Sequence, residues 1–167
     1  MKKILLAATL LLVTACVPKV TMPNITPVND ASYQQVIDVP IQSKQQIFEK
    51  SKQWMAKTFV SSKQVIEYEN LLEGKIIGNG SANLTFTYVS SLTGPVTQNY
   101  HARFSMTEDI KEGKARITFD QIWVQNGYGV GGGESITQDG WDKLKPKLIA
   151  LTQNLTEYLI KSPSESW

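Results

Sequence analysis

The sequence is poor in the side chains that most metal sites and nucleophilic enzymes need. Among 167 residues it has one cysteine, Cys16, and one histidine, His101. A structural zinc site takes several cysteine or histidine ligands, and a serine or cysteine nucleophile usually needs a nearby base such as histidine. The chain also lacks a Gly-x-Ser-x-Gly elbow and a Gly-Lys-Ser/Thr phosphate loop. We therefore expect no metal, no cofactor and no enzymatic activity.

Runs of like charge are missing as well. The chain has 17 lysines and arginines and 15 acidic residues, with a formal net charge of +2. Lys2 and Lys3 lie in a leader segment, and without them 15 basic residues face 15 acidic ones. A nucleic-acid partner normally leaves a basic patch, and an anionic membrane surface draws a polybasic cluster. The sequence therefore predicts no nucleic-acid partner and no membrane binding driven by charge.

The first sixteen residues have the organisation of a bacterial lipoprotein signal peptide. Two lysines precede an apolar run from Ile4 to Ala15. The run is too short to cross a bilayer, which takes about 20 helical residues, but it suits a secretory signal. Its last positions, Val13-Thr14-Ala15-Cys16, resemble a lipobox. This resemblance implies that residues 1–15 are cleaved, and that Cys16 carries a diacylglycerol on sulfur and an acyl chain on its amino group.

A lipidated Cys16 predicts a permanent place on a membrane. One acyl chain binds only reversibly, at about 0.8 kcal/mol per buried CH₂, so two or three chains on one residue make a stable anchor. The alternative is an ordinary signal peptide with a chance cysteine at the cut, which would leave a reactive exported thiol without a disulfide partner. Val17 follows, rather than the aspartate that retains many Gram-negative lipoproteins on the inner membrane. The sequence thus favours the outer membrane, facing the periplasm.

The rest of the chain divides into a tether, one domain and a tail. Residues 16–32 hold three prolines and no apolar period, which predicts an extended tether. Residues 33–161 alternate between strand and helix patterns, and their length suggests one domain. Residues 162–167 are expected to be a frayed tail.

The domain begins with a strand and a helix. The strand pattern of residues 33–39 stops at Pro40, which cannot donate to a sheet. A helix then opens at Ser43, with Gln46 at the spacing of a capping box. Its predicted apolar stripe consists of Ile47, Phe48, Ser51, Trp54, Met55 and Phe59.

Four more strands and a second helix follow. Residues 65–71, 75–89, 98–108 and 115–124 alternate with a period of two, typical of strands with one buried face. Residues 139–161 carry a leucine stripe, with a kink or a broken first turn expected near Lys145 because of Pro146. The predicted fold is α+β: two layers, an antiparallel curved sheet covered by two helices. The predicted core faces are Ile66 and Tyr68; Ala82, Leu84, Phe86 and Tyr88; Tyr100, Ala102, Phe104 and Met106; Ile117, Phe119 and Trp123, with a register that can shift near Asp120.

The block from Trp54 to Gly80 resembles a bacterial family of exported proteins. It includes Trp54-Met55-Ala56-Lys57-Thr58-Phe59 and Gly74-Lys75-Ile76-Ile77-Gly78-Asn79-Gly80. That family is known as a domain of unknown function with a TATA-binding-protein-like fold. The resemblance extends over about Tyr33 to Lys161 and implies the same order of elements but no reaction. The fold name does not imply DNA binding, since this chain has one copy of the unit and no basic surface.

Three groups of residues could carry chemistry. The glycine run 127–132 fits G-x-G-x-x-G, but no strand follows the next helix, so a loop is the better interpretation. Glu67 and Glu69 fall on one face of the alternating strand, where they could form an acid–base pair or simply face solvent. His101 is expected on a solvent-facing strand surface. An enzyme built from Glu67, Glu69 and His101 would need the three to converge.

Two functions remain open. The first is a non-enzymatic interaction or structural domain of the cell envelope, held on the membrane through Cys16 and contacting an envelope protein. The alternative is a module that binds a small apolar ligand in a pocket between the long C-terminal helix and the sheet. The glycine-rich loop would serve as its lid.

Overall fold

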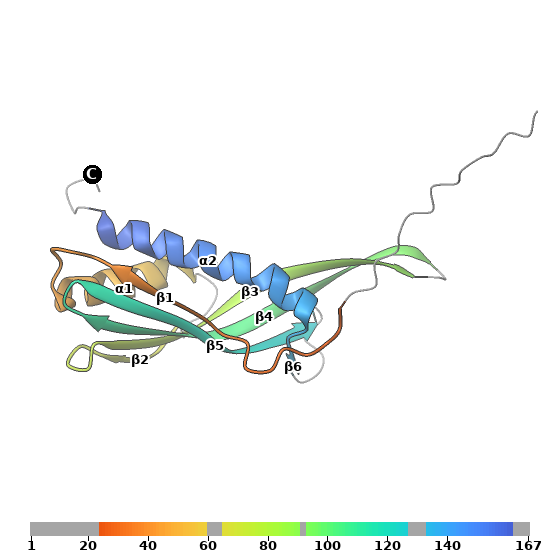
Figure 1. The fold of residues 1–167 in the computed structure, drawn as a ribbon, viewed down its shortest axis with the longest axis horizontal. Coiled ribbons are helices and arrows are strands. Elements are labelled where there is room, and N and C mark those ends of the chain that lie inside the picture. Colours follow the sequence, from red (N-terminus) through yellow and green to blue (C-terminus); the bar gives the residue numbers. More distant parts are fainter. Residues whose placement is uncertain (1–23, 60–64, 91–92, 127–132, 162–167) are drawn as a thin grey trace, which may run out of the picture.

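The chain folds into two layers, a sheet and a pair of helices. The structure is a computed structural model that describes residues 24–59, 65–90, 93–126 and 133–161. An antiparallel six-stranded sheet is covered on one face by two helices (Figure 1). This confirms the predicted α+β fold. The predicted signal peptide with Cys16, the glycine run 127–132 and the tail 162–167 lie outside the described residues.

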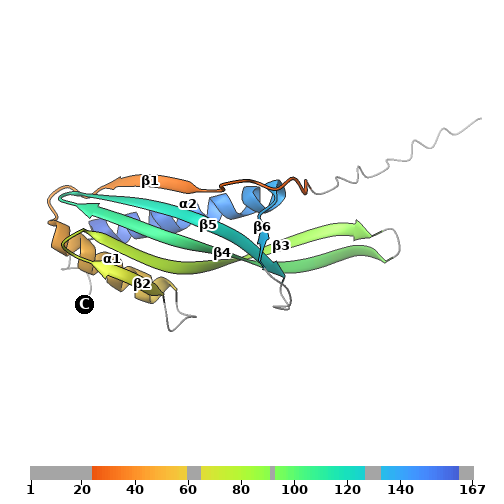
Figure 2. The same ribbon diagram turned by 90° about the horizontal axis from the view of Figure 1, so that it is seen from below.

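The elements follow the predicted order with one short strand added. The sheet order is β1-β5-β4-β3-β2, and the added strand β6 pairs with β5. β3 and β4 form a long hairpin whose tip extends beyond the helices (Figure 2). The bounds are β1 (Tyr33–Asp38), α1 (Lys44–Thr58), β2 (Ile66–Asn70), β3 (Lys75–Ser90), β4 (Gly94–Lys111), β5 (Lys114–Asn126), β6 (Glu134–Ser135) and α2 (Gln138–Ile160).

Helix α1 begins as the sequence predicts. The Gln46 backbone N–H donates to Ser43 Oγ at 3.2 Å, and the Ser43 backbone N–H donates to Gln46 Oε1 at 2.9 Å. This capping box satisfies two backbone donors that the first helical turn leaves without partners. The predicted stripe then faces the sheet, with Ile47, Phe48, Ser51, Trp54 and Met55 buried.

Helix α2 lies along the sheet as one continuous helix. Leu144, Leu148, Leu155 and Leu159 are fully buried against the sheet. They fill the space where an apolar ligand pocket was predicted, so that pocket is occupied by the protein's own core. The predicted break near Lys145 is wrong. Pro146 lies on the exposed face of the helix, where water can satisfy the carbonyl that proline leaves without a donor.

Part of the predicted tether is fixed on the domain. The Val28 N–H donates to the Ile136 carbonyl at 2.8 Å, and the Gln138 N–H donates to the Thr26 carbonyl at 2.9 Å. Residues 24–32 therefore run beside the chain segment that leads into α2. These backbone hydrogen bonds give the segment order that its proline-rich composition did not indicate.

The core contains a row of aromatic rings beneath α1. Trp54 contacts Phe59 with ring centroids 5.7 Å apart, and Phe104 contacts Phe119 at 5.4 Å in an edge-on arrangement. Phe59 and Phe104 join the two pairs at 6.4 Å. Gly80 makes room for this junction, because a Cβ there would lie 2.4 Å from the Phe104 ring. Small backbone at Gly80 therefore brings two strands and a helix end together.

Strand β5 contains a bulge that changes the face on which its side chains lie. Ser105 pairs with Asp120, but Arg103 pairs with Trp123, so β5 has one more residue than β4 in this stretch. Gln121 takes up the extra residue at φ 49°. Phe119 before the bulge is fully buried, whereas Trp123 after it is half-buried on the opposite face. The prediction of Trp123 as a core residue is therefore wrong, because the bulge reverses the alternation.

Strand β2 has a similar irregularity. Ile66 pairs with Gly78 and Tyr68 with Ile77, so the register shifts between them. Glu69 pairs with the fully buried Ile76 and therefore faces the helices. The prediction that Ile66 and Tyr68 share a face is wrong for the same reason: one extra residue exchanges the two faces.

A carboxyl group lies buried between α1 and β4. Glu108 is fully buried, and Ser51 Oγ donates to its Oε1 at 2.6 Å. The second oxygen, Oε2, has no hydrogen-bond partner. Burial raises the pKa of Glu108 to about 7, an effect that the hydrogen bond from Ser51 partly opposes. The folded protein therefore holds a proton here that the unfolded chain releases at lower pH.

Stability should fall as the pH rises because of Glu108. Below pH 4.5 the side chain is protonated in both states, and above about 7 it is ionised in both. Between these values the folded state binds more protons, so the free energy of unfolding decreases by about 3 kcal/mol across the window. Urea unfolding from pH 4 to 8 measures this decrease. In Glu108→Gln it should largely disappear, because glutamine does not ionise.

Glu157→Gln provides the control for this measurement, because Glu157 lies exposed on α2. It should keep the pH dependence of the original protein. If Glu108→Gln were as pH-dependent as Glu157→Gln, the role assigned to Glu108 would be wrong.

The bulge predicts a contrast between two substitutions of Gln121. Its positive φ suits glycine and is costly for a β-branched side chain. Gln121→Gly should unfold within about 1 kcal/mol of the original protein, and Gln121→Val should be less stable by about 2 kcal/mol. Urea denaturation of both variants tests this. Equal stability of the two would argue against a left-handed backbone at Gln121.

Candidate functional site

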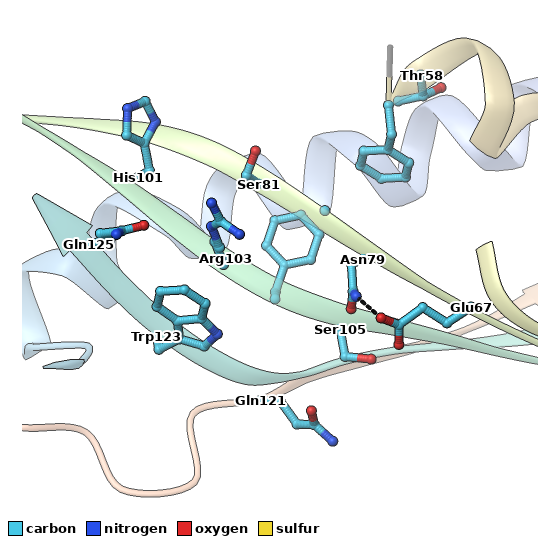
Figure 3. Close-up of a pocket in the computed structure, with 13 residues that line it drawn as sticks. Thr58, Glu67, Asn79, Ser81, His101, Arg103, Ser105, Gln121, Trp123 and Gln125 are labelled. Carbon is cyan, nitrogen blue, oxygen red and sulfur yellow. Dashed lines mark hydrogen bonds between the residues drawn. The ribbon is translucent and has the colours of Figure 1, made fainter. Parts of the chain in front are cut away.

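The sheet face opposite the helices is polar and has a hollow in it. The hollow has a volume of about 740 Å³. Its walls are mainly amide, hydroxyl and charged side chains, contributed by β2, β3, β4 and β5 (Figure 3). The lining residues are Thr58, Phe59, Glu67, Asn79, Gly80, Ser81, His101, Arg103, Phe104, Ser105, Gln121, Trp123 and Gln125.

Strand pairing sets the order of these side chains. Ser81 lies opposite Arg103, which lies opposite Trp123, and this row crosses three strands. The neighbouring row continues from His101 to Gln125. Because side chains two residues apart share a face of a strand, the two rows form one continuous polar surface.

The floor of the hollow is aromatic. Phe59 and Phe104 belong to the core, yet both line the hollow. They are reached through Gly80, which has no side chain to cover them. The hollow therefore combines polar walls with a small apolar floor, a common composition for ligand sites.

Arg103 is the main cationic group of the site. Its guanidinium carbon lies 5.2 Å from the centre of the Trp123 ring, a cation–π contact. The backbone of Gly133 lies against the same ring, because a Cβ there would be 2.2 Å from it. Trp123 is thus fixed in place and in turn supports Arg103.

No carboxylate in the described part of the chain pairs with Arg103. The contrast is Arg116, on the same face, whose Nη2 lies 2.7 Å from Asp109 Oδ2. Glu67 lies in the hollow but accepts a hydrogen bond from the Asn79 amide. Figure 3 shows Glu67 at the end of the hollow away from Arg103 and His101. The site therefore has a donor-rich end and an acceptor-only end.

The predicted acid–base pair does not form. Glu67 faces the hollow, whereas Glu69 faces the helices and makes a 2.9 Å ion pair with Lys52 of α1. The bulge in β2 separates them, because it places consecutive glutamates of the expected alternation on opposite faces. His101 lies on the open face as predicted and lines the hollow. The three residues of the predicted enzyme therefore do not converge.

Sequence reasoning missed Arg103 and Trp123. Arg103 was assigned to the solvent face without a role, and Trp123 to the core. The one signal was the expected register shift near Asp120, and its position and direction could not be derived from the residues.

Two searches of the described residues found nothing further. They contain no group of three or more histidine, cysteine, aspartate or glutamate side chains placed to hold a metal ion. No helix among them is long and apolar enough to span a membrane.

Comparison with solved structures places the fold among known ones. A TBP-like protein from Parabacteroides distasonis ATCC 8503 is similar with a TM-score of 0.61 and 11% identity, covering 86% of this chain and 98% of that one. A DUF4468 family protein from Bacteroides ovatus ATCC 8483 is similar with a TM-score of 0.58 and 15% identity, covering 84% and 92%. At these identities the likeness shows the fold alone.

The family comparison is more direct. Among curated proteins, none matches this chain. A family match covers residues 33–125, which is more than half of the chain and includes β1 through nearly all of β5. The chain therefore belongs to the DUF4468 family, a domain of unknown function with a TBP-like fold.

Proposed function

We propose that this protein is a lipid-anchored binding domain of the cell envelope that uses the open face of its sheet. The observation that carries the proposal is the polar hollow, which lies on the face that neither helix covers. The helices bury the other face against a closed core. The open face is thus the one with groups free to contact a partner.

The layout of the hollow supports binding rather than catalysis. A general base has to reach the proton it abstracts at hydrogen-bond distance, and a nucleophile has to reach its base. Glu67 is instead hydrogen-bonded to Asn79, and His101 lies toward the other end of the hollow (Figure 3). A non-enzymatic role in contacting an envelope protein fits this arrangement.

A small-ligand binding module is the second candidate. The hollow falls within the usual range of ligand sites, about 300–1,000 Å³. Its polar walls favour a polar ligand, in contrast to the apolar one that a pocket beneath α2 would take.

The anchor rests on Cys16 and can be tested by fractionation. Cys16→Ser removes the sulfur that would carry the diacylglycerol, so the protein should move from the membrane pellet to the soluble fraction. Val17→Ala is the matched control and should stay in the pellet. Mass spectrometry of the mature N-terminus should find an acylated Cys16. Retention of Cys16→Ser in the membrane would refute the anchor.

The binding face can be tested by photo-crosslinking in intact cells. A photoreactive amino acid replaces Ser81, which is exposed in the hollow, or Gln153, which is exposed on α2. We expect reproducible adducts from position 81 and none from position 153, because the partner contacts the open face. Adducts confined to position 153, or none at either position, would contradict the proposed binding face.

A further inference from the structure

The two arginines on the open face differ in their partners. Arg116 is neutralised by Asp109, with an Nη2–Oδ2 distance of 2.7 Å. Arg103 is exposed, rests on Trp123, and has no acidic partner among residues 24–59, 65–90, 93–126 and 133–161. A structural role in the sheet would be served by a pair such as that of Arg116. An unpaired guanidinium beside a hollow instead leaves its donors available to a ligand.

The chemistry of a guanidinium restricts the group that it binds. Arginine has five N–H donors in a planar fork and no acceptor, and it matches a carboxylate or another oxyanion with two parallel hydrogen bonds. The contact with Trp123 holds this fork in place, so less side-chain freedom is lost on binding. The end of the hollow at Arg103 therefore fits an oxyanion.

The other end of the hollow restricts the rest of the ligand. Ionised Glu67 can only accept hydrogen bonds, so it favours hydroxyl or N–H groups and repels a second anion. Ser81, Ser105 and Asn79 lie between the two ends, and their side chains both donate and accept. This pattern disfavours polyphosphates and polyanions. It fits a ligand with one acid group and several hydroxyls.

A sugar acid has these properties. Its hydroxyls donate and accept, and the C–H groups of its ring can cover the aromatic floor formed by Phe59 and Phe104. We propose that the hollow binds the carboxylate of an acidic sugar through Arg103, with the sugar hydroxyls directed toward Asn79 and Glu67. The inference rests on the proposed binding role of the open face and specifies the ligand for it.

The test compares probes that differ in one group. Methyl β-D-glucuronide carries a carboxylate where methyl β-D-glucoside carries a hydroxymethyl group. Each is titrated against the full mature chain in a detergent without a sugar headgroup, and saturation-transfer NMR reports binding at millimolar concentrations. The glucuronide should bind and the glucoside should bind about tenfold more weakly or not at all, because it cannot form the charged hydrogen bonds.

Three variants assign the binding to the guanidinium. Arg103→Gln should weaken glucuronide binding about tenfold or more. Arg103→Lys should also weaken it, because lysine keeps the charge but loses the planar fork. Arg116→Gln is the matched control on the same face and should bind as the original protein does. Circular dichroism checks that all three variants fold.

Three results would overturn the proposal. They are equal binding of glucuronide and glucoside, unchanged binding in Arg103→Gln, and no binding of either sugar. A third probe, N-acetyl-glutamate amide, separates a sugar acid from an acidic peptide, and preferential binding of this probe would make the occupant a peptide. Crosslinks from position 81 that persist in Arg103→Gln would leave the binding face intact while removing the sugar-acid site.

Discussion

The extra residue at Gln121 decides which side chains of β5 reach the core and which reach the open face. Before it, Ile117 and Phe119 are fully buried beneath the helices. After it, Ile122 and Val124 turn to the core, and Trp123 and Gln125 line the hollow. The support for Arg103 and one wall of the site thus depend on a single residue in a left-handed conformation, and a regular strand would have hidden Trp123 and left Arg103 without a ring to rest on.

The two faces of the sheet carry different tasks. The helix-covered face holds the aromatic row, the leucines of α2 and the buried Glu108, so its packing sets the stability of the domain. The open face contributes polar side chains whose substitution leaves that core in place. Separation of this kind lets a ligand site change without loss of the fold. The low identity between this chain and the similar solved structures, 11% and 15%, is consistent with it.

Regular alternation could be predicted from the sequence, and its interruptions could not. Leu84, Phe104 and Met106 lie in the core as expected, because period-two patterns follow from strand geometry alone. The Ser43 cap was also local enough to identify. Trp123 and Glu69 were assigned to the wrong face because each follows a bulge, and a bulge is fixed by pairing with a distant strand. The docking of residues 24–32 depends equally on partners more than a hundred positions away, which a local pattern does not contain.

The hydrogen bond between Val28 and Ile136 sets a geometric limit on where the domain can work. Because the chain is held on the domain from Asn24 onward, only the eight residues from Cys16 to Pro23 remain as a leash. Fully extended, eight residues span at most about 28 Å. With a lipid on Cys16, the domain would stay within about its own diameter of the bilayer. Its hollow would then sample only ligands concentrated at the membrane surface, and molecules deeper in the surrounding compartment would have to diffuse to it.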